Sequence, residues 1–200
     1  MENDLFATFL RQVFSVMFAV LKPGGSYYIF HADSEGENFR ASLRKAGFKI
    51  AQCCIWVKNT MVMGRQDYQW QHEPCLYGWE HQWNSDRKQT TVWNFDKPQR
   101  NAIHPTMKPI ALMAYPISNS STLGQIVLDI FSGSGSTLMA CQQIDRICYA
   151  MEIDPKYVTA TIHRYRAMFP EQPVRLVRNG ELLDVEQTAD MIADQNKVIQ

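Results

Sequence analysis

The chain has 200 residues, of which 46% are hydrophobic and 20% are charged, values close to those of ordinary globular proteins. This composition excludes a disordered tail, a collagen-like fibre and a coiled-coil rod, and the length suits one domain with a substantial core. Twenty basic and twenty acidic side chains give a formal net charge of zero, which argues against a strongly basic nucleic-acid coat protein.

The N-terminal segment predicts a core helix. Apolar residues recur at helical spacing over residues 5–21, and a Lys-Pro-Gly-Gly turn at residues 22–25 marks the helix stop. Arg11 interrupts the apolar stretch, and Glu2 and Asp4 stand where a signal peptide has basic residues. We therefore expect neither a targeting nor a membrane segment, and five cysteines without a CxxC pair favour a reducing cytoplasm.

The middle of the chain contains short apolar runs bounded by turn residues. Strands are predicted at residues 26–31, 48–57, 74–77 and 90–95, and helices at residues 38–46 and 109–115. Pro116 is expected to end or kink the second of these helices. Between residues 78 and 101 the composition becomes polar, so this segment is the least core-like part of the chain.

The C-terminal third alternates regularly between strands and helices. Strands are predicted at residues 126–131, 147–153 and 174–177, and helices at residues 137–144 and 155–168. Such alternation indicates βαβ units and a largely parallel sheet. The residues after 183 are expected to form a frayed polar helix or tail.

A glycine loop follows the first strand of this third. Residues 126–135 read IVLDIFSGSG, and Gly133 and Gly135 would let a ligand approach the backbone at a helix N-terminus. Glu152 follows the next strand, where such units bind ribose hydroxyls, so a nucleoside-containing cofactor is indicated. Leu138 replaces the third glycine of the dinucleotide fingerprint. A tight turn beside a surface carboxylate is the competing interpretation of these residues.

Five motifs in a fixed order carry a resemblance to a known family. They are LKPGG at 21–25, IWVK at 55–58, HEP at 72–74, HPTMKP at 104–109 and LDIFSGSGST at 128–137. Together they resemble the DNA amino-methyltransferases, which methylate N6 of adenine or N4 of cytosine. The order is similar to the β-type permutation, in which the catalytic half precedes the cofactor-binding half, and the resemblance covers residues 3–168.

The resemblance implies an α/β class, with a Rossmann-like AdoMet-dependent methyltransferase sheet that carries helices on both faces. It implies one methyltransferase domain over residues 1–200. Its expected parts are the remainder of the catalytic half at 1–78, a short DNA-contacting or target-recognition insert at 79–102, an AdoMet-binding half at 103–183 and a tail at 184–200.

The resemblance also implies where S-adenosylmethionine (AdoMet) binds. The implied cofactor-binding residues are Thr106, Lys108, Asp129, Phe131, Gly133, Gly135 and Glu152. Asp129 would face the methionine amino group, and Glu152 would accept hydrogen bonds from both ribose hydroxyls. Thr106 and Lys108 would close over the methionine carboxylate.

The family's catalytic motif pairs an Asp, Asn or Ser with Pro-Pro and an aromatic residue. The target base is flipped out of double-stranded DNA and stacks on the aromatic ring, while the motif accepts hydrogen bonds from the exocyclic amine. This sequence contains no Pro-Pro, so the catalytic residues are unknown and the strand that carries the motif is expected to be absent. A partner chain or an upstream segment would supply it, and the chain alone would have little activity. Adenine N6 is the expected target rather than cytosine N4, from the general form of HPTMKP and HEP.

The polar segment mixes aromatic and basic side chains. Arg87, Lys88, Lys97 and Arg100 are the candidate DNA-binding residues, in company with Trp79, Trp83 and Trp93. Two interpretations of these side chains remain: they contact DNA, or they form an ordinary solvated surface. His72 and Glu73 have no metal-ligand spacing around them, so we expect no metal and assign both residues a structural role.

Two other functions remain as alternatives to an active methyltransferase. One is a non-catalytic module that binds AdoMet and DNA and needs a partner chain. The other is a nicotinamide-dependent oxidoreductase, which the absent third glycine and the HPTMKP motif disfavour.

Overall fold

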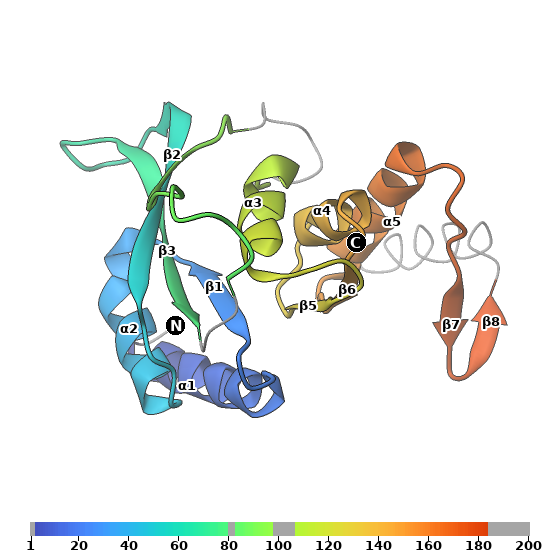
Figure 1. Ribbon diagram of the computed structural model, residues 1–200, viewed down its shortest axis with the longest axis horizontal. Helices are drawn as coiled ribbons and strands as arrows, with labels where there is room; N and C mark the ends of the chain where they lie inside the picture. The colour runs from blue at the N-terminus through green and yellow to red at the C-terminus, as the bar shows by residue number, and fades with distance from the viewer. Residues whose placement is uncertain (1–2, 80–82, 98–106, 184–200) are drawn as a thin grey trace, which may run out of the picture.

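Strands and helices alternate along most of the computed structural model, which describes residues 3–79, 83–97 and 107–183 (Figure 1). The helices are α1 (Asn3–Val20), α2 (Gly36–Lys45), α3 (Ile110–Ser120), α4 (Ser136–Gln143) and α5 (Pro155–Met168), with a short 3-10 turn η1 (Asp33–Glu35). The strands are β1 (Ser26–Phe30), β2 (Gln52–Val62), β3 (Trp70–Trp79), β4 (Val92–Asn94), β5 (Ile126–Asp129), β6 (Ile147–Ala150), β7 (Leu176–Arg178) and β8 (Glu181–Leu183).

The N-terminal strands form a four-stranded sheet in the order β1-β3-β2-β4. β3 is antiparallel to both of its neighbours, while β4 is parallel to β2. The sheet is therefore mixed. Its antiparallel β2–β3 pair is joined as a hairpin, which needs no crossover helix.

Helices cover both faces of this sheet, as the sequence predicted. Tyr27 and Ile29 of β1 point to one face, where they pack with residues of α1 and α2. Tyr28 and Phe30 point to the other face and pack with Trp93 and with side chains of α3. Successive strand residues face opposite sides, so β1 packs against neighbours on both, with Tyr27 and Ile29 buried and Tyr28 and Phe30 half-buried.

The C-terminal strands β5 and β6 are parallel and form a separate two-stranded sheet. α4 connects them and packs on one face, where Val127 and Cys148 contact buried Ala140 and Cys141. α3 lies between this sheet and the four-stranded one (Figure 1), because Leu112 belongs to one apolar cluster and Ile117 to the other.

Three sequence predictions differ from the structure. The predicted helix does not end at Pro116, because α3 continues to Ser120 with Pro116 buried beside Leu112 and Ile117, and this packing outweighs the lost backbone donor. β2 and β3 extend well beyond the predicted strands and form a projecting hairpin (Figure 1). β7 pairs with an unpredicted strand, β8, through the left-handed residues Asn179 and Gly180, a typical hairpin turn.

The described part of the chain contains no helix that is both long enough and apolar enough to cross a membrane.

Replacing Asp154 with alanine is expected to lower the free energy of unfolding by about 1 kcal/mol, because Asp154 is the N-cap of α5. Its Oδ1 accepts the backbone N–H of Lys156 at 2.9 Å. Urea denaturation followed by circular dichroism measures the change. Asp154→Asn keeps a side-chain acceptor and is the control, and equal losses in the two variants would contradict a capping role.

Candidate functional site

The glycine loop lies between the carboxyl end of β5 and the first turn of α4. Gly133 and Gly135 both have left-handed backbones, with φ of +53° and +74°, and Gly135 is the N-cap of α4. Left-handed φ values favour glycine, and unpaired N–H groups of a helix N-terminus suit a polar or anionic ligand. The two glycines that predicted the loop therefore occupy the positions whose backbone conformation favours glycine.

Gly135 has a packing role of its own. A Cβ at this position would lie 2.5 Å from Cγ2 of Thr161 on α5, a separation that forces one of the two groups to move. The absence of a side chain at Gly135 thus lets α5 pack against the loop. Thr161 adds a hydrogen bond from its hydroxyl to the Gly133 carbonyl, at 3.2 Å.

Glu152 lies just beyond β6 and holds the loop through its carboxylate. Its Oε2 accepts the N–H of Gly133 at 2.8 Å, and its Oε1 accepts the N–H of Asp154 at 2.8 Å. A carboxylate has about four acceptor positions, so each oxygen keeps capacity for a further donor. The side chain predicted to bind a ribose is therefore also a positioning group for the loop.

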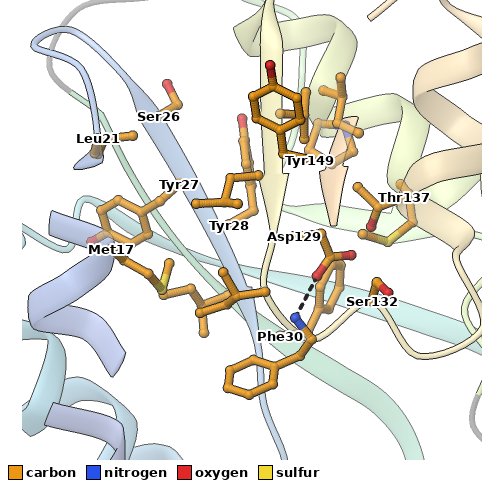
Figure 2. A pocket seen from close by; sticks show the side chains of 18 of the residues that line it. Met17, Leu21, Ser26, Tyr27, Tyr28, Phe30, Asp129, Ser132, Thr137 and Tyr149 are labelled. Carbon is orange, nitrogen blue, oxygen red and sulfur yellow. Dashed lines mark hydrogen bonds between the residues drawn. The ribbon is translucent and has the colours of Figure 1, made fainter. Parts of the chain in front are cut away.

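Asp129 ends β5 and faces the cavity (Figure 2). Its Oδ1 accepts the N–H of Phe131 at 3.1 Å, which turns the chain away from the strand. The Phe131 ring is 61% exposed, and its centroid lies 6.1 Å from that of Phe9 on α1. An exposed aromatic ring beside a carboxylate can contact both the apolar and the cationic part of a ligand.

Lys108 lies near the same loop and is paired with an acidic residue. Its Nζ is 2.9 Å from Oε1 of Glu73, while Lys58 Nζ is 3.4 Å from Oε2 of the same carboxylate. The Lys108 ammonium also lies 5.0 Å from the Phe30 ring centroid. Glu73 thus orients Lys108, a role that the sequence prediction of a merely structural Glu73 missed. The cross-strand pairing of β2 with β3 brings Lys58 and Glu73 together, and this register was not available from the sequence.

Arg164 on α5 is a second residue that sequence reasoning missed. Its guanidinium donates to the Ser134 carbonyl at 2.9 Å and to the Ser136 hydroxyl at 3.1 Å. Ser136 donates in turn to the Lys108 carbonyl at 2.7 Å. Burial lowers the pKa of Arg164 from its ordinary value. These bonds fix the loop against α5 and against the segment that contains Lys108.

A cavity of about 1190 Å³ opens beside the loop. Figure 2 shows its two walls, with Met17, Tyr27 and Tyr28 from α1 and β1 on one side and Asp129 and Tyr149 from β5 and β6 on the other. Its lining includes Lys108 and the loop, so the glycine loop forms one end of a larger space between the two sheets.

Three of the four candidate DNA-binding residues lie in the described part of the chain. Arg87 and Lys88 are exposed, and Lys97 is half-buried with its N–H bonded to Asn59. Arg100 lies outside the described residues, as does Thr106 of the cofactor prediction. The aromatic part of the prediction needs one correction, because Trp93 is only 5% exposed and packs in the core.

Potential metal ligands do not gather in groups of three or more among the residues described. His72 instead packs its ring against Trp70, with centroids 5.5 Å apart.

Comparison with known proteins gives a consistent result. The profile of a family described as DNA methylase matches residues 2–163. The chain is similar to the Type II methyltransferase M2.MboI of Moraxella bovis, with 31% identity over 93 residues, 44% of this chain and 33% of that protein. The match thus spans about a third of the length of this curated relative.

Solved structures share the fold. The structure of M1.HpyAVI in complex with SAM has a TM-score of 0.66 and 25% identity, over 78% of this chain and 82% of that chain. The PvuII DNA methyltransferase, described as cytosine-N4-specific, has a TM-score of 0.73 and 15% identity, over 95% of this chain and 76% of that chain. The predicted methyltransferase fold class is therefore confirmed.

Proposed function

Because this chain belongs to the family of DNA methylases, we propose that it binds AdoMet over residues 129–135 and serves in methyl transfer to a DNA base. The observation that carries the proposal is the pair of carboxylates at the carboxyl ends of neighbouring parallel strands. Asp129 ends β5, Glu152 follows β6, and the glycine loop lies between them. Ligands of open α/β sheets bind beyond this edge.

The residues present fit AdoMet. Asp129 keeps acceptor positions for the ligand's ammonium group beyond its bond to Phe131, and Glu152 keeps two for the ribose hydroxyls. The Lys108 ammonium has three donors, so its pairing with Glu73 leaves donors for a carboxylate. Gly133 and the N-terminus of α4 leave the backbone open to close approach.

AdoMet supplies an electrophilic methyl group on a sulfonium sulfur. The work of this chain is to bind and orient that donor: Asp129 holds its ammonium group, Glu152 holds its ribose, and Arg164 and Thr161 hold the loop in place. Positioning of this kind lowers the barrier because the reacting atoms no longer need to find their alignment.

Replacing Glu152 with alanine is expected to weaken AdoMet binding by about 1.5 to 3 kcal/mol, the range for hydrogen bonds to a charged group. The variant loses acceptors for the ligand and also the bond that holds Gly133. Isothermal titration calorimetry with AdoMet and S-adenosylhomocysteine measures the affinity. Glu171→Ala, which removes an exposed carboxylate outside the loop, is the control. Wild-type affinity in Glu152→Ala would remove this residue from the site, and absence of binding by the folded wild-type chain would refute the proposed function.

We further propose that double-stranded DNA is the second ligand and that Arg87 and Lys88 contact its phosphates. Alanine at both positions is expected to weaken binding equally for all DNA sequences and to reduce the salt slope by about one to two. Fluorescence anisotropy at several salt concentrations provides the measurement. The matched control replaces Arg44 and Lys45, an adjacent exposed pair at the end of α2. Equal losses in the two double variants would indicate a general charge effect.

The proposed target is N6 of a flipped adenine, in preference to N4 of cytosine, within a modification enzyme of the cytoplasm. This part of the proposal draws on the HPTMKP and HEP motifs, and nucleoside mass spectrometry of methylated DNA distinguishes the two products. A specific observation favours a second candidate, a binding module that acts only with a partner chain. The sequence has no Pro-Pro, and the cavity separates β1 from β5.

A further inference from the structure

Two free cysteines lie in contact between α4 and β6. Cys141 is in the last turn of α4 and is completely buried, while Cys148 is the second residue of β6 and is half-buried. Both belong to the apolar cluster that packs α4 on the β5–β6 sheet, and their side chains are hydrogen-bonded to each other. The proposed binding of AdoMet uses neither thiol, so the pair has no role in the function proposed above.

Secondary structure on both sides holds the two thiols together. The Cys141 carbonyl accepts the N–H of Arg146 at 2.9 Å, so the chain returns directly from the end of α4 into β6. Ile147 and Tyr149 are exposed on the face of β6 that α4 does not cover, so by alternation the Cys148 side chain points to α4. The contact therefore depends on the packing of a helix on a strand and not on a loop.

The two thiols differ in acidity. Cys148 donates its hydrogen bond to the sulfur of Cys141, which lowers the pKa of Cys141. Arg146 adds to this lowering, while burial and Asp129 act against it. The same hydrogen bond, together with burial, raises the pKa of Cys148. Because the thiolate is the nucleophile in thiol oxidation, Cys141 is the sulfur that reacts first and Cys148 is the one that resolves the product.

Cys54 and Cys75 provide an internal comparison. They are register partners in the β2–β3 hairpin and are both buried. Burial raises the pKa of Cys54 to about 11 and raises that of Cys75 well above its ordinary value. Both therefore stay protonated at neutral pH, and a protonated thiol is a poor nucleophile. Proximity alone does not make this second pair reactive.

The burial of Cys141 also selects the oxidant. Its side chain has no exposed surface, so a bulky disulfide reagent cannot reach the sulfur in the folded chain. A peroxide is much smaller, and it oxidises a thiolate directly to a sulfenic acid. A second thiol in contact converts that acid into a disulfide before further oxidation.

We propose that hydrogen peroxide converts Cys141 and Cys148 into a reversible disulfide, and that this bond weakens the cofactor site. The Cys141 thiolate attacks one peroxide oxygen, the O–O bond breaks, and a sulfenic acid and hydroxide result. The Cys148 sulfur then attacks the Cys141 sulfur, the S–O bond breaks, and the thiol proton leaves with the hydroxyl group as water. The proton lost earlier by Cys141 neutralises the hydroxide. The two sulfurs lose two electrons, which reduce the peroxide to two molecules of water.

The disulfide would act on the glycine loop through the two elements that it joins. An S–S bond is about 2.05 Å long, so the hydrogen-bonded sulfurs must move toward each other. α4 carries the loop at its N-terminus, and β6 leads to Glu152, whose carboxylate holds the Gly133 N–H at 2.8 Å. A shift of α4 against β6 changes the distance that this bond spans. Displacements of about 1 Å are enough to disturb a site of this kind.

Peptide mass spectrometry of the full chain tests the disulfide. The folded protein is treated with hydrogen peroxide, alkylated without reductant and digested with trypsin, which cleaves between the two cysteines at Arg146. A Cys141–Cys148 cross-link that dithiothreitol removes is expected. Cys148→Ser should stop at a sulfenic acid on Cys141, which dimedone labels. Absence of the cross-link from the folded wild-type chain, or preferential linkage of Cys54 to Cys75, would overturn the proposal.

Amide hydrogen exchange tests the effect on the loop without any ligand. The Gly133 N–H, which is bonded to Glu152, is expected to exchange about tenfold faster in the oxidised chain. Reduction should restore the slower rate. Cys148→Ser treated with peroxide is the matched control and should show no change. An unchanged rate in the oxidised wild-type chain would refute transmission from the disulfide to the loop.

Calorimetry with AdoMet on the same samples measures the consequence for binding, and this part rests on the proposed function. The oxidised chain is expected to bind about tenfold more weakly than the reduced chain. Equal affinities would refute the regulatory effect, and an equal loss in peroxide-treated Cys148→Ser would overturn it by assigning the loss to another oxidised side chain. Absence of binding by the reduced chain would refute the proposed function alone, because the cross-link and the Gly133 exchange rate are measured without AdoMet.

Discussion

Valine in place of Gly133 is expected to abolish AdoMet binding. The backbone of Gly133 has φ of +53°, a region that costs a β-branched residue on the order of 1–3 kcal/mol. The added side chain would also occupy the space through which a ligand reaches the loop, and a shift of the backbone would break the N–H bond to Glu152. Titration calorimetry with AdoMet measures the loss.

Gly180→Val is the matched control for this substitution. Gly180 also has a left-handed backbone, with φ of +84°, and a Cβ there would meet nothing within 4 Å. The control therefore carries similar backbone strain at a site away from the loop, and it should keep wild-type affinity. Normal binding by a folded Gly133→Val variant would show that the loop is only a turn.

Methyl transfer by the 200-residue chain alone is expected to stay near background. Transfer requires the methyl carbon and the amine nitrogen to be held in line at about 3–3.5 Å, and this alignment supplies much of the rate enhancement. The chain has a proposed cradle for the donor, but its sequence has no Pro-Pro to hold the acceptor. Radiolabelled transfer from AdoMet to undermethylated DNA is the direct assay.

The matching control is AdoMet binding by the same preparation, which should be measurable although turnover is not. Robust turnover would contradict the expectation and point to a substitute for the missing motif. Asp4, His31 and Asp33 would be examined first. His31 is 5% exposed, and its Nε2 has no hydrogen-bond partner in the described structure.

Local patterns predicted most elements of the fold. The bounds of α5 were predicted to the residue. Asp at the N-cap and Pro at the first helical position are recognisable helix-start signals, and Asp154 and Pro155 occupy these positions. The long β2–β3 hairpin was not, since Met61, Val62 and Met63 are exposed and give no burial alternation. The path of α3 through Pro116 depends on packing, which no local rule contains.

The residues of the candidate site likewise fall into two groups, those that local patterns predicted and those that depend on tertiary packing. Gly133, Gly135 and Glu152 were predicted because their spacing after a strand has a local physical reason. Glu73 and Arg164 were missed, because Glu73 pairs with Lys108 and Arg164 bonds to the loop, each from an element distant in sequence. Their roles follow from the register of β3 and the docking of α5, which are properties of the folded chain.

The separation of the four-stranded sheet from the β5–β6 sheet has a consequence for cooperativity. No strand pairing joins β1 to β5 in the described structure, but α3 packs in both the apolar cluster that contains Leu112 and the one that contains Ile117. Each half can then open with its own free energy, as a separate foldon. A ligand in the cavity contacts residues of both halves, so its binding would couple the opening of one foldon to that of the other.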